Sequence, residues 1–448
     1  MHGQETVAST VIFGLPAMGF ATALFVLTYV VVMTERINRA VVALAAAGLM
    51  IIGGVLTQEA AIEGIDFNTI GLLIGMMVIV AITRRSGVFQ YLAIWSAKKV
   101  QAQPWGILLM LSLVTAVLSA LLDNVTTVLL IVPVTLLITE ELKVSPYPYL
   151  FAIIFSANIG GTATLIGDPP NIMIGSATGL TFNSFVVNLA PVVVVILLAT
   201  LLPIYWLWGR QLKASDADRN RVMQFNERDA ITDVRLLKQS LIVIGLVILG
   251  FMTAHSLGLE AATIALFGAA MLLLLHNLGN DAEAQSKSVH QAFGEVEWVT
   301  IFFFVGLFIV VHGVDATGLL RLLAEQVLAL TGGDLGATAM VILWSSAVLS
   351  AVVDNIPFVA TMIPLIKSMA PTFGGDVQLL PLWWSLSLGA CLGGNGTLVG
   401  ASANLVVAGF AERAGQPIRF VKFMLLAFPL MLLSIVISSG YIYWRYLP

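Results

Sequence analysis

Long apolar runs follow one another along most of the chain, separated by short polar stretches. A run of about 20 apolar residues is long enough to cross a hydrocarbon core of about 30 Å as one helix. The first run is too long for a cleaved signal peptide and no basic region precedes it, so we expect it to remain in the mature protein. Membrane-spanning helices are predicted at 12–33, 38–56, 67–83, 184–208, 238–256, 260–278, 297–314 and 420–444.

Two further apolar zones, 104–175 and 336–411, are interrupted by Asp, Asn, Gly and Pro. Such residues are costly in lipid unless they line a cavity enclosed by protein. Each zone therefore predicts a re-entrant helical hairpin followed by a broken helix. The hairpins are expected over 104–140 and 336–370, and the broken helices over 147–177 and 381–411.

The chain contains an internal repeat. When it is shifted by 231 residues, segment 67–93 aligns with 298–324 without a gap, and Asp123-Asn124 falls on Asp354-Asn355. Beyond the hairpins the shift becomes 233 residues, which aligns the Gly, Thr and Asn residues of the two broken helices. Rare polar residues in an apolar sequence seldom coincide by chance, so we interpret the chain as a duplicated unit.

Each copy, 1–208 and 238–448, then has five spans plus a re-entrant hairpin and a broken helix, with 209–237 as a linker. An odd number of crossings places the second copy upside down, so the predicted fold is an all-α polytopic membrane protein of two inverted-topology repeats. Basic residues in short loops stay cytoplasmic, and with the linker on that side only Arg321, Lys367 and Arg445 lie outside. We expect an inner-membrane protein with both termini on the non-cytoplasmic side.

Composition narrows the class of function. Hydrophobic residues make up 59% and charged residues 10% of the 448, against about 45–50% and about 25% in soluble domains, so the partner of most of this surface is the lipid bilayer. A net charge of −4 offers no basic field for nucleic acid. The chain has a single cysteine, Cys391, and no Gly-Lys dipeptide, so neither a multi-cysteine metal site nor a phosphate-binding P-loop is predicted. We expect a transporter and not an enzyme, with no tightly bound cofactor or metal.

Three aspartates lie in the interrupted zones. Asp123 and Asp354 occupy the predicted hairpin tips, and Asp168 lies in the first broken helix. A carboxylate at membrane depth costs a few kcal/mol or more, unless a proton, a cation or a partner relieves that cost. These residues are therefore candidates for ion coupling with a proton or sodium, although the two tip residues are also explained as caps of the second hairpin arm.

The broken helices expose backbone groups. Paired glycines and Pro169-Pro170 interrupt the helical hydrogen bonds, and breaks of this kind bind solute and ion in inverted-repeat transporters. Close helix packing is the alternative explanation for the small residues. Neither break contains Arg, Lys or His, so a small neutral polyhydroxy solute fits better than a multivalent anion such as citrate. The predicted substrate-binding residues are Asn124, Thr126, Thr127, Asn158, Gly160, Gly161, Thr162, Thr164, Asn171, Asn355, Gly393, Gly394, Asn395, Thr397, Ser402 and Asn404.

The segments 121–127, 158–171 and 389–404 resemble the arsenite permease/P-protein group of the ion transporter superfamily. The resemblance covers nearly the full chain. It implies an elevator-type secondary transporter, in which the hairpins and broken helices move against a scaffold formed by the other spans. It also implies a homodimer and an arsenite-stimulated ATPase subunit as candidate partners.

The resemblance further implies export of a small inorganic solute, arsenite or antimonite, with proton entry through Asp123 and Asp354. At neutral pH trivalent arsenic is mainly the neutral trihydroxide, which suits hydroxyl, amide and backbone groups. A lone Cys391 argues against capture by three thiolates. Two alternatives stay open at this point: a sodium/proton antiporter, and a cation-coupled anion or dicarboxylate transporter.

Overall fold

A computed structural model describes residues 11–34 and 36–447, and these residues form helices joined by loops, with no strand. Nine helices in this part of the chain are long and apolar enough to cross a membrane, and four shorter apolar helices accompany them. The predicted all-α polytopic membrane fold is confirmed. Lipid offers no hydrogen-bond partners, so the backbone groups of an apolar run must be satisfied within the run itself, and a helix does this.

The two halves have the same order of elements. The first contains α1 (Ala17–Met33), α2 (Arg39–Ile52), α3 (Gln58–Glu63), α4 (Phe67–Arg84), α5 (Val88–Lys99), α6 (Pro104–Leu121), α7 (Asn124–Glu141), α8 (Tyr147–Gly161), α9 (Pro169–Thr178) and α10 (Phe182–Ile204). The second contains α12 (Val234–Leu257), α13 (Ala261–Asn277), α14 (Ala282–Gly294), α15 (Trp298–Ala316), α16 (Leu319–Thr331), α17 (Leu335–Val352), α18 (Asn355–Lys367), the short α19 (Ala370–Phe373), α20 (Leu380–Gly393), α21 (Ser402–Arg413) and α22 (Phe420–Tyr446).

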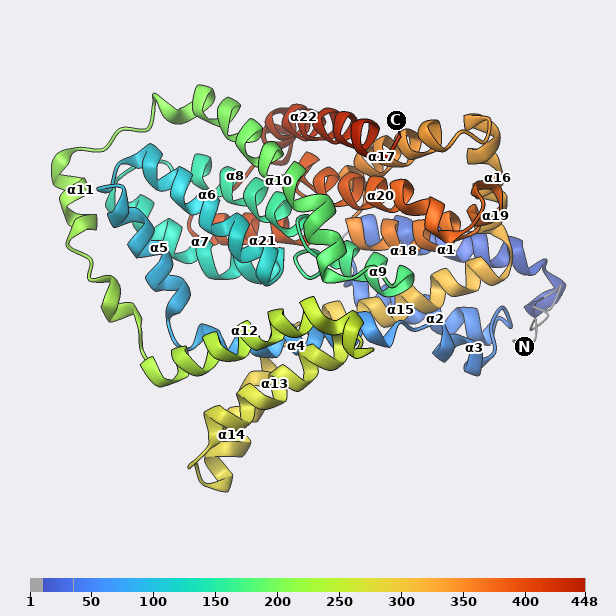
Figure 1. Ribbon diagram of the computed structural model, residues 1–448, viewed down its shortest axis with the longest axis horizontal. Helices are drawn as coiled ribbons and strands as arrows, with labels where there is room; N and C mark the ends of the chain where they lie inside the picture. The colour runs from blue at the N-terminus through green and yellow to red at the C-terminus, as the bar shows by residue number, and fades with distance from the viewer. Residues whose placement is uncertain (1–10, 35, 448) are drawn as a thin grey trace.

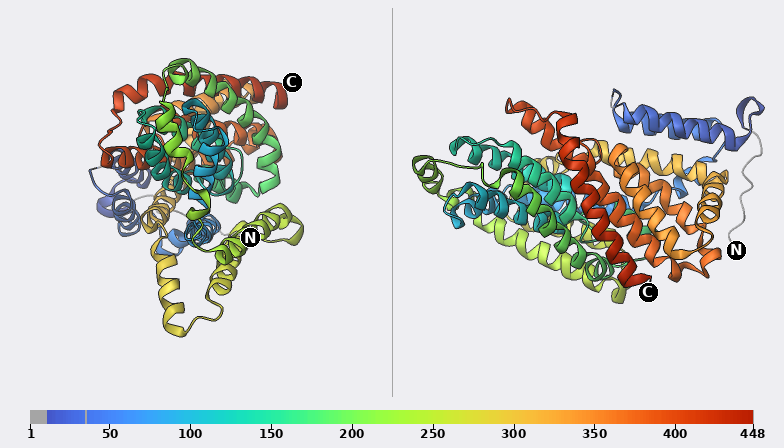
Figure 2. Two further views of the ribbon diagram at one scale, coloured as in Figure 1. Left: turned by 90° about the vertical axis from the view of Figure 1, so that its left-hand side faces the viewer. Right: turned by 90° about the horizontal axis from the view of Figure 1, so that it is seen from above.

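One layer of the molecule, here called the scaffold layer, consists of α1, α2, α4, α12, α13 and α15. Its main contacts join the two halves, because α2 packs on α15 and α4 packs on α13. Gly75 permits one crossing, since a Cβ there would lie 2.6 Å from the Ala265 carbonyl carbon, and Gly306 permits the other, at 2.5 Å from that of Ala43. Figure 1 shows α2, α4, α12, α13 and α15 along the lower side, with the α13–α14 arm projecting from it; Figure 2 gives two further views.

The second layer, here called the hairpin layer, contains the hairpins α6–α7 and α17–α18, which lie toward opposite ends of the long axis (Figure 1). α6 packs on the broken helix α8–α9 of its own half, and α17 packs on α20–α21. The second arms reach across, because α7 contacts α21 and α18 contacts α9. The hairpins and breaks of both halves therefore form one body.

The final span of each half also belongs to the hairpin layer. α10 packs on α8 and α22 packs on α20, while α10 and α22 contact each other. We expected these spans in the scaffold, so that part of the prediction differs from the structure. The reason is chain connection: a short turn at Gly179–Thr181 joins α9 directly to α10, so the span folds back on its own broken helix.

The linker contains a π-helical turn (Tyr205–Gly209), α11 (Asp216–Met223) and a 3-10 turn (Glu227–Ala230). It is attached to the first hairpin and α5, because Lys98 Nζ lies 2.5 Å from Glu227 Oε2 and Arg221 Nε lies 3.3 Å from Glu141 Oε2. The hydrogen bond from Lys98 lowers the pKa of Glu227 below its ordinary value. The linker is thus attached to the hairpin layer.

Candidate functional site

The hairpin tips and both breaks meet at the centre of the hairpin layer through a chain of amide side chains. Asn158, on α8, accepts a hydrogen bond from Asn124 Nδ2 of the first tip at 3.2 Å. Its own Nδ2 donates to Asn395 Oδ1 at 3.0 Å and to Asn404 Oδ1 at 2.9 Å, both from the second break. All four side chains are buried. Four of the predicted site residues, far apart in sequence, therefore form one network.

Asp168 is buried beside this network, with a side chain that is 1% exposed. Its Oδ1 accepts a hydrogen bond from Asn355 Nδ2 of the second hairpin tip at 3.3 Å. Its Oδ2 has no partner among the described residues. A buried carboxylate oxygen without a partner requires an explanation, and its place between the first break and the second tip makes it the centre of the candidate site.

Asn171 and Asn404 hold the unwound segments in shape. Asn171 Nδ2 donates to the carbonyl oxygens of Thr162 at 3.1 Å and Thr164 at 2.9 Å. Asn404 Nδ2 does the same at the other break, to Gly394 at 2.7 Å and Thr397 at 2.9 Å. Both amides therefore satisfy backbone groups that the break leaves without helical partners.

The threonines of the breaks bind the hairpins. Thr164 Oγ1 donates to the Ala120 carbonyl at 2.6 Å, and Thr397 Oγ1 donates to the Ala351 carbonyl at 2.5 Å. Thr162 Oγ1 donates within its own helix to the Asn158 carbonyl at 2.8 Å. In this structure the hydroxyls of these three threonines all donate to backbone carbonyls.

The glycines of the breaks allow close packing. A Cβ at Gly160 would lie 2.2 Å from the Ala116 carbonyl oxygen, and one at Gly393 would lie 2.5 Å from that of Ala347. Gly161 and Gly394 face Gly167 and Gly400 across their own breaks in the same way. For these four positions the packing explanation accounts for the residue type.

The two tip aspartates cap the second hairpin arms. Asp123 Oδ1 accepts from the Thr126 backbone N–H at 2.7 Å and its Oδ2 accepts from Thr126 Oγ1 at 2.5 Å. Asp354 Oδ1 accepts from the Ile356 backbone N–H at 3.1 Å. Thr127 Oγ1, buried next to the first tip, has no partner among the described residues.

A cation that sequence reasoning missed reaches the second tip. Arg39, the first residue of α2, donates from Nη1 to Asp354 Oδ2 at 3.0 Å and to Ser402 Oγ at 2.7 Å, and from Nη2 to Thr300 Oγ1 at 2.9 Å. The breaks themselves contain no basic residue, but α2 brings Arg39 to a carboxylate that lies 315 residues away in the chain. No local pattern signals that pairing.

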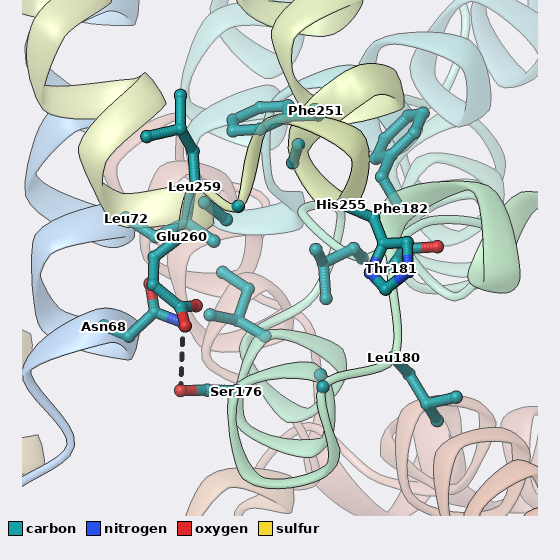
Figure 3. A pocket seen from close by; sticks show the side chains of 17 residues that line it. Asn68, Leu72, Ser176, Leu180, Thr181, Phe182, Phe251, His255, Leu259 and Glu260 are labelled. Carbon is teal, nitrogen blue, oxygen red and sulfur yellow. Dashed lines mark hydrogen bonds between the residues drawn. The ribbon is translucent and has the colours of Figure 1, made fainter.

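Two cavities lie between the layers, and one of them borders the site. One, of about 280 Å³, is lined by Arg39, Glu297, Asp354 and Ser402, together with apolar residues of α1, α17 and α21. The other, of about 380 Å³, lies between α4, α9, α10, α12 and α13 and contains none of the predicted site residues. Figure 3 shows Asn68 bonded to Ser176 on one side of it with Glu260 beside them, and His255 and Thr181 on the other side.

Asp123 and Asp168 lack the cationic partner that Asp354 has. Within residues 11–34 and 36–447, no Lys, Arg or His forms an ion pair with either carboxylate. In the same part of the chain no cluster of three or more His, Cys, Asp or Glu side chains has the arrangement of a metal site.

Comparison with known proteins gives a consistent picture. The sequence profile of the citrate transporter family, CitMHS, matches residues 29–389. The chain is 42% identical over 430 residues to an uncharacterized transporter of Mycobacterium tuberculosis, covering 95% of this chain and 98% of the other. It is 40% identical over 434 residues to a 46 kDa membrane protein of Mycobacterium leprae, with the same coverage.

Human P protein is 33% identical over 503 residues, which cover 94% of this chain and 59% of the P protein. That similarity confirms the P-protein part of the predicted resemblance. Among solved structures, the YdaH transporter of Alcanivorax borkumensis, whose topology is described as unusual, superposes with a TM-score of 0.59 at 13% identity over 94% of this chain and 97% of that one. At that identity the likeness concerns the fold.

Proposed function

Because the chain belongs to the citrate transporter family, we propose that it is a secondary active transporter that couples solute movement to a proton or sodium ion carried by the three aspartates of the site, Asp168, Asp123 and Asp354. The observation that carries this proposal is the buried Asp168 carboxylate: among the described residues its Oδ2 has no partner, and no Lys, Arg or His forms an ion pair with it. A charge in such a place is tolerated only when a bound proton or cation neutralises it.

The proposed substrate is arsenite or antimonite, moved out of the cell. Three buried polar atoms near the tips have no partner among the described residues: Asn124 Oδ1, Thr127 Oγ1 and Asn395 Nδ2. Together they offer acceptors and donors without net charge, which matches a small neutral trihydroxide. This set supports the proposal because buried polar groups are normally satisfied.

Arg39 favours a second candidate, a cation-coupled transporter of a small carboxylate anion. Its guanidinium borders the 280 Å³ cavity and is 23% exposed. Of its five N–H donors, three take part in the hydrogen bonds described above. The remaining donors would suit one carboxylate oxygen, and the family's description as citrate transporters points the same way.

For the transport movement we propose an elevator in which the hairpin layer slides along the scaffold layer. The two halves make unequal contacts across the layer boundary. In the second half the start of α15 meets the start of α21, since Arg39 bridges Thr300 and Ser402. In the first half the start of α4 meets the far end of α9, where Asn68 Nδ2 donates to Ser176 Oγ at 3.1 Å. A hairpin layer displaced along the scaffold layer, toward one end of it, would give the two repeats unequal contacts of this kind.

Purified protein in proteoliposomes tests the function. With a proton or sodium gradient imposed, uptake of arsenite, of a labelled dicarboxylate, and collapse of the proton gradient by sodium are measured in parallel. The variant Asp168→Asn should lose gradient-driven accumulation, whereas Asp376→Asn, at an exposed aspartate, should keep it.

The outcome separates the candidates. Arsenite accumulation supports metalloid export, dicarboxylate accumulation supports the second candidate, and sodium-driven collapse without solute supports the antiporter. Gradient-driven accumulation that survives in Asp168→Asn would contradict ion coupling at this residue.

A further inference from the structure

The contact between Arg39 and the second hairpin tip crosses from the scaffold layer to the hairpin layer. Arg39 belongs to α2 and Asp354 to the turn before α18, and their side chains are 23% and 13% exposed. Ser402 Oγ also donates to Asp354 Oδ2, at 3.0 Å, so one carboxylate oxygen receives two hydrogen bonds. This is an ion pair, only partly screened by solvent, between two bodies that are proposed to slide.

The pair has no counterpart in the first half. Aligning the capping residues of α2 and α13 places Ala261 at the position of Arg39. The first tip carboxylate, Asp123, has only local partners in the hydrogen bonds described above. Among the described residues, Arg39 is therefore the one cation that forms an ion pair with a tip carboxylate, and it holds only the second tip.

We propose that Arg39 is a latch that competes with the coupling cation for Asp354, so that the second hairpin tip leaves the scaffold only after Asp354 has taken up a proton or a sodium ion. The proposal rests on the function proposed above. A guanidinium keeps its charge under all ordinary conditions, so the pair opens when Asp354 is neutralised. Separating the two while both are charged would leave two partly desolvated charges without partners.

A second carboxylate is placed to receive Arg39 when the tip leaves. Glu297 lines the same cavity and accepts a hydrogen bond from Thr300 Oγ1 at 3.0 Å, and Thr300 already accepts from Arg39. A small movement of the guanidinium would exchange one carboxylate for the other. The latch thus resets without leaving Arg39 unpaired.

The other hydrogen bonds that join the scaffold layer to the same hairpin, among the described residues, carry no charge. Tyr29 on α1 donates to the Pro357 carbonyl at 2.5 Å and also lies 2.7 Å from Thr361 Oγ1. A cation leaves these bonds unaffected, so the ion pair is the contact through which ion binding controls the position of the tip.

The test measures the position of the layers directly. Cysteines placed at Asn68 and Ser176, whose side chains are 3.1 Å apart across the layer boundary, should form a disulfide when the hairpin layer is in the position described here. The natural Cys391 is fully buried, and a Cys391→Ser background removes its thiol from the assay. Disulfide yield is measured without substrate, at several pH values and sodium concentrations. Three proteins that carry the cysteine pair are compared: one with the natural Arg39, one with Arg39→Gln and one with Arg39→Lys.

With Arg39 present, the yield should fall as the pH is lowered or sodium is added. Arg39→Gln should shift the equilibrium about tenfold away from the disulfide position, equivalent to about 1.4 kcal/mol, and should remove its dependence on both cations. Arg39→Lys keeps the charge and should keep the dependence, which separates a latch from a merely structural contact.

The carboxylates that face the latch are Asp354, Glu297, Asp123 and Asp168, the last bonded to Asn355 of the same tip, and Asp66 lies beside the reporter pair. A response that comes from Asp66, Asp123 or Asp168 would persist in Arg39→Gln, and that result would overturn the latch. Failure of the proposed function shows separately, as solute uptake that depends on neither cation in the unmodified protein.

Discussion

The unequal contacts of the two halves predict how far the hairpin layer moves. The start of α4 faces Ser176, whereas the start of α15 faces Ser402, which the repeat aligns with Pro169. Ser176 lies seven residues after Pro169 along α9. The movement is taken to give each half the contact that the other half makes now. At a rise of 1.5 Å per residue, these seven residues correspond to a displacement of the hairpin layer by about 10 Å along the scaffold.

The exchanged state has its own contact. The repeat aligns Asn68 with Val299 and Ser176 with Gly409, so these two positions should meet only after the movement. A side chain is tolerated at Gly409, because no atom lies within 4 Å of an added Cβ. The double variant Val299→Cys/Gly409→Cys should therefore form a disulfide during turnover and not at rest, and the Asn68→Cys/Ser176→Cys pair should do the reverse.

Each disulfide should stop transport, and a reductant should restore it. Vesicles carrying either pair are oxidised with and without substrate and gradient, and cross-linking and flux are measured on the same sample. Continued transport by protein that is fully cross-linked at 68 and 176 would refute the sliding movement. Cross-linking of the 299 and 409 pair at rest, without turnover, would refute the register argument.

Three further predictions concern single residues. Asp168→Asn should leave the melting temperature unchanged or raise it while coupled flux is lost, because an amide removes a buried charge; thermal unfolding beside the flux assay checks this. Gly160→Ala should destabilise the protein by about 1–3 kcal/mol, because the new methyl would lie 2.2 Å from a carbonyl oxygen of α6. The control is Gly245→Ala, where no atom lies within 4 Å of the added methyl. Its unfolding in detergent should match that of the unmodified protein. The pKa of Glu227 is lowered by its hydrogen bond from Lys98, so the attachment of the linker is fully present above the ordinary value of 4.5 and is lost as the pH falls below it. The linker should be cut faster by an acid-active protease in Lys98→Ala than in the natural protein at pH 5.5, with the difference disappearing well below pH 4.5; equal cutting at pH 5.5 would contradict this account.

Much of the fold could be predicted because its determinants are local. The length of an apolar run decides whether a helix crosses the membrane, and Asp-Asn or Gly-Gly pairs mark where such a helix must turn or break. The aligned pair Gly75 and Gly306 is a further example, since each lies at a crossing between the halves.

The site was harder to predict because a polar residue in an apolar region has two uses. The sequence predicts Thr164 and Asn171 as substrate ligands, yet in the structure they satisfy backbone groups of the hairpin and the break. Both uses need the same side-chain chemistry, and only the geometry distinguishes them. The pairing of Arg39 with Asp354 depends on packing between distant helices, so no sequence interval indicates it.

The crossed packing of the scaffold layer has a consequence for biosynthesis. α4 is made long before α13, and at about 5–20 residues per second the interval is on the order of ten seconds or more. During that time only lipid or an insertion factor can cover the face of α4 around Gly75. The face of α2 that later packs on α15 is uncovered in the same way until α15 has been made. Neither half can complete its own scaffold, so the protein assembles only when the second half has been inserted, and a chain divided in the linker should assemble when both pieces are supplied together.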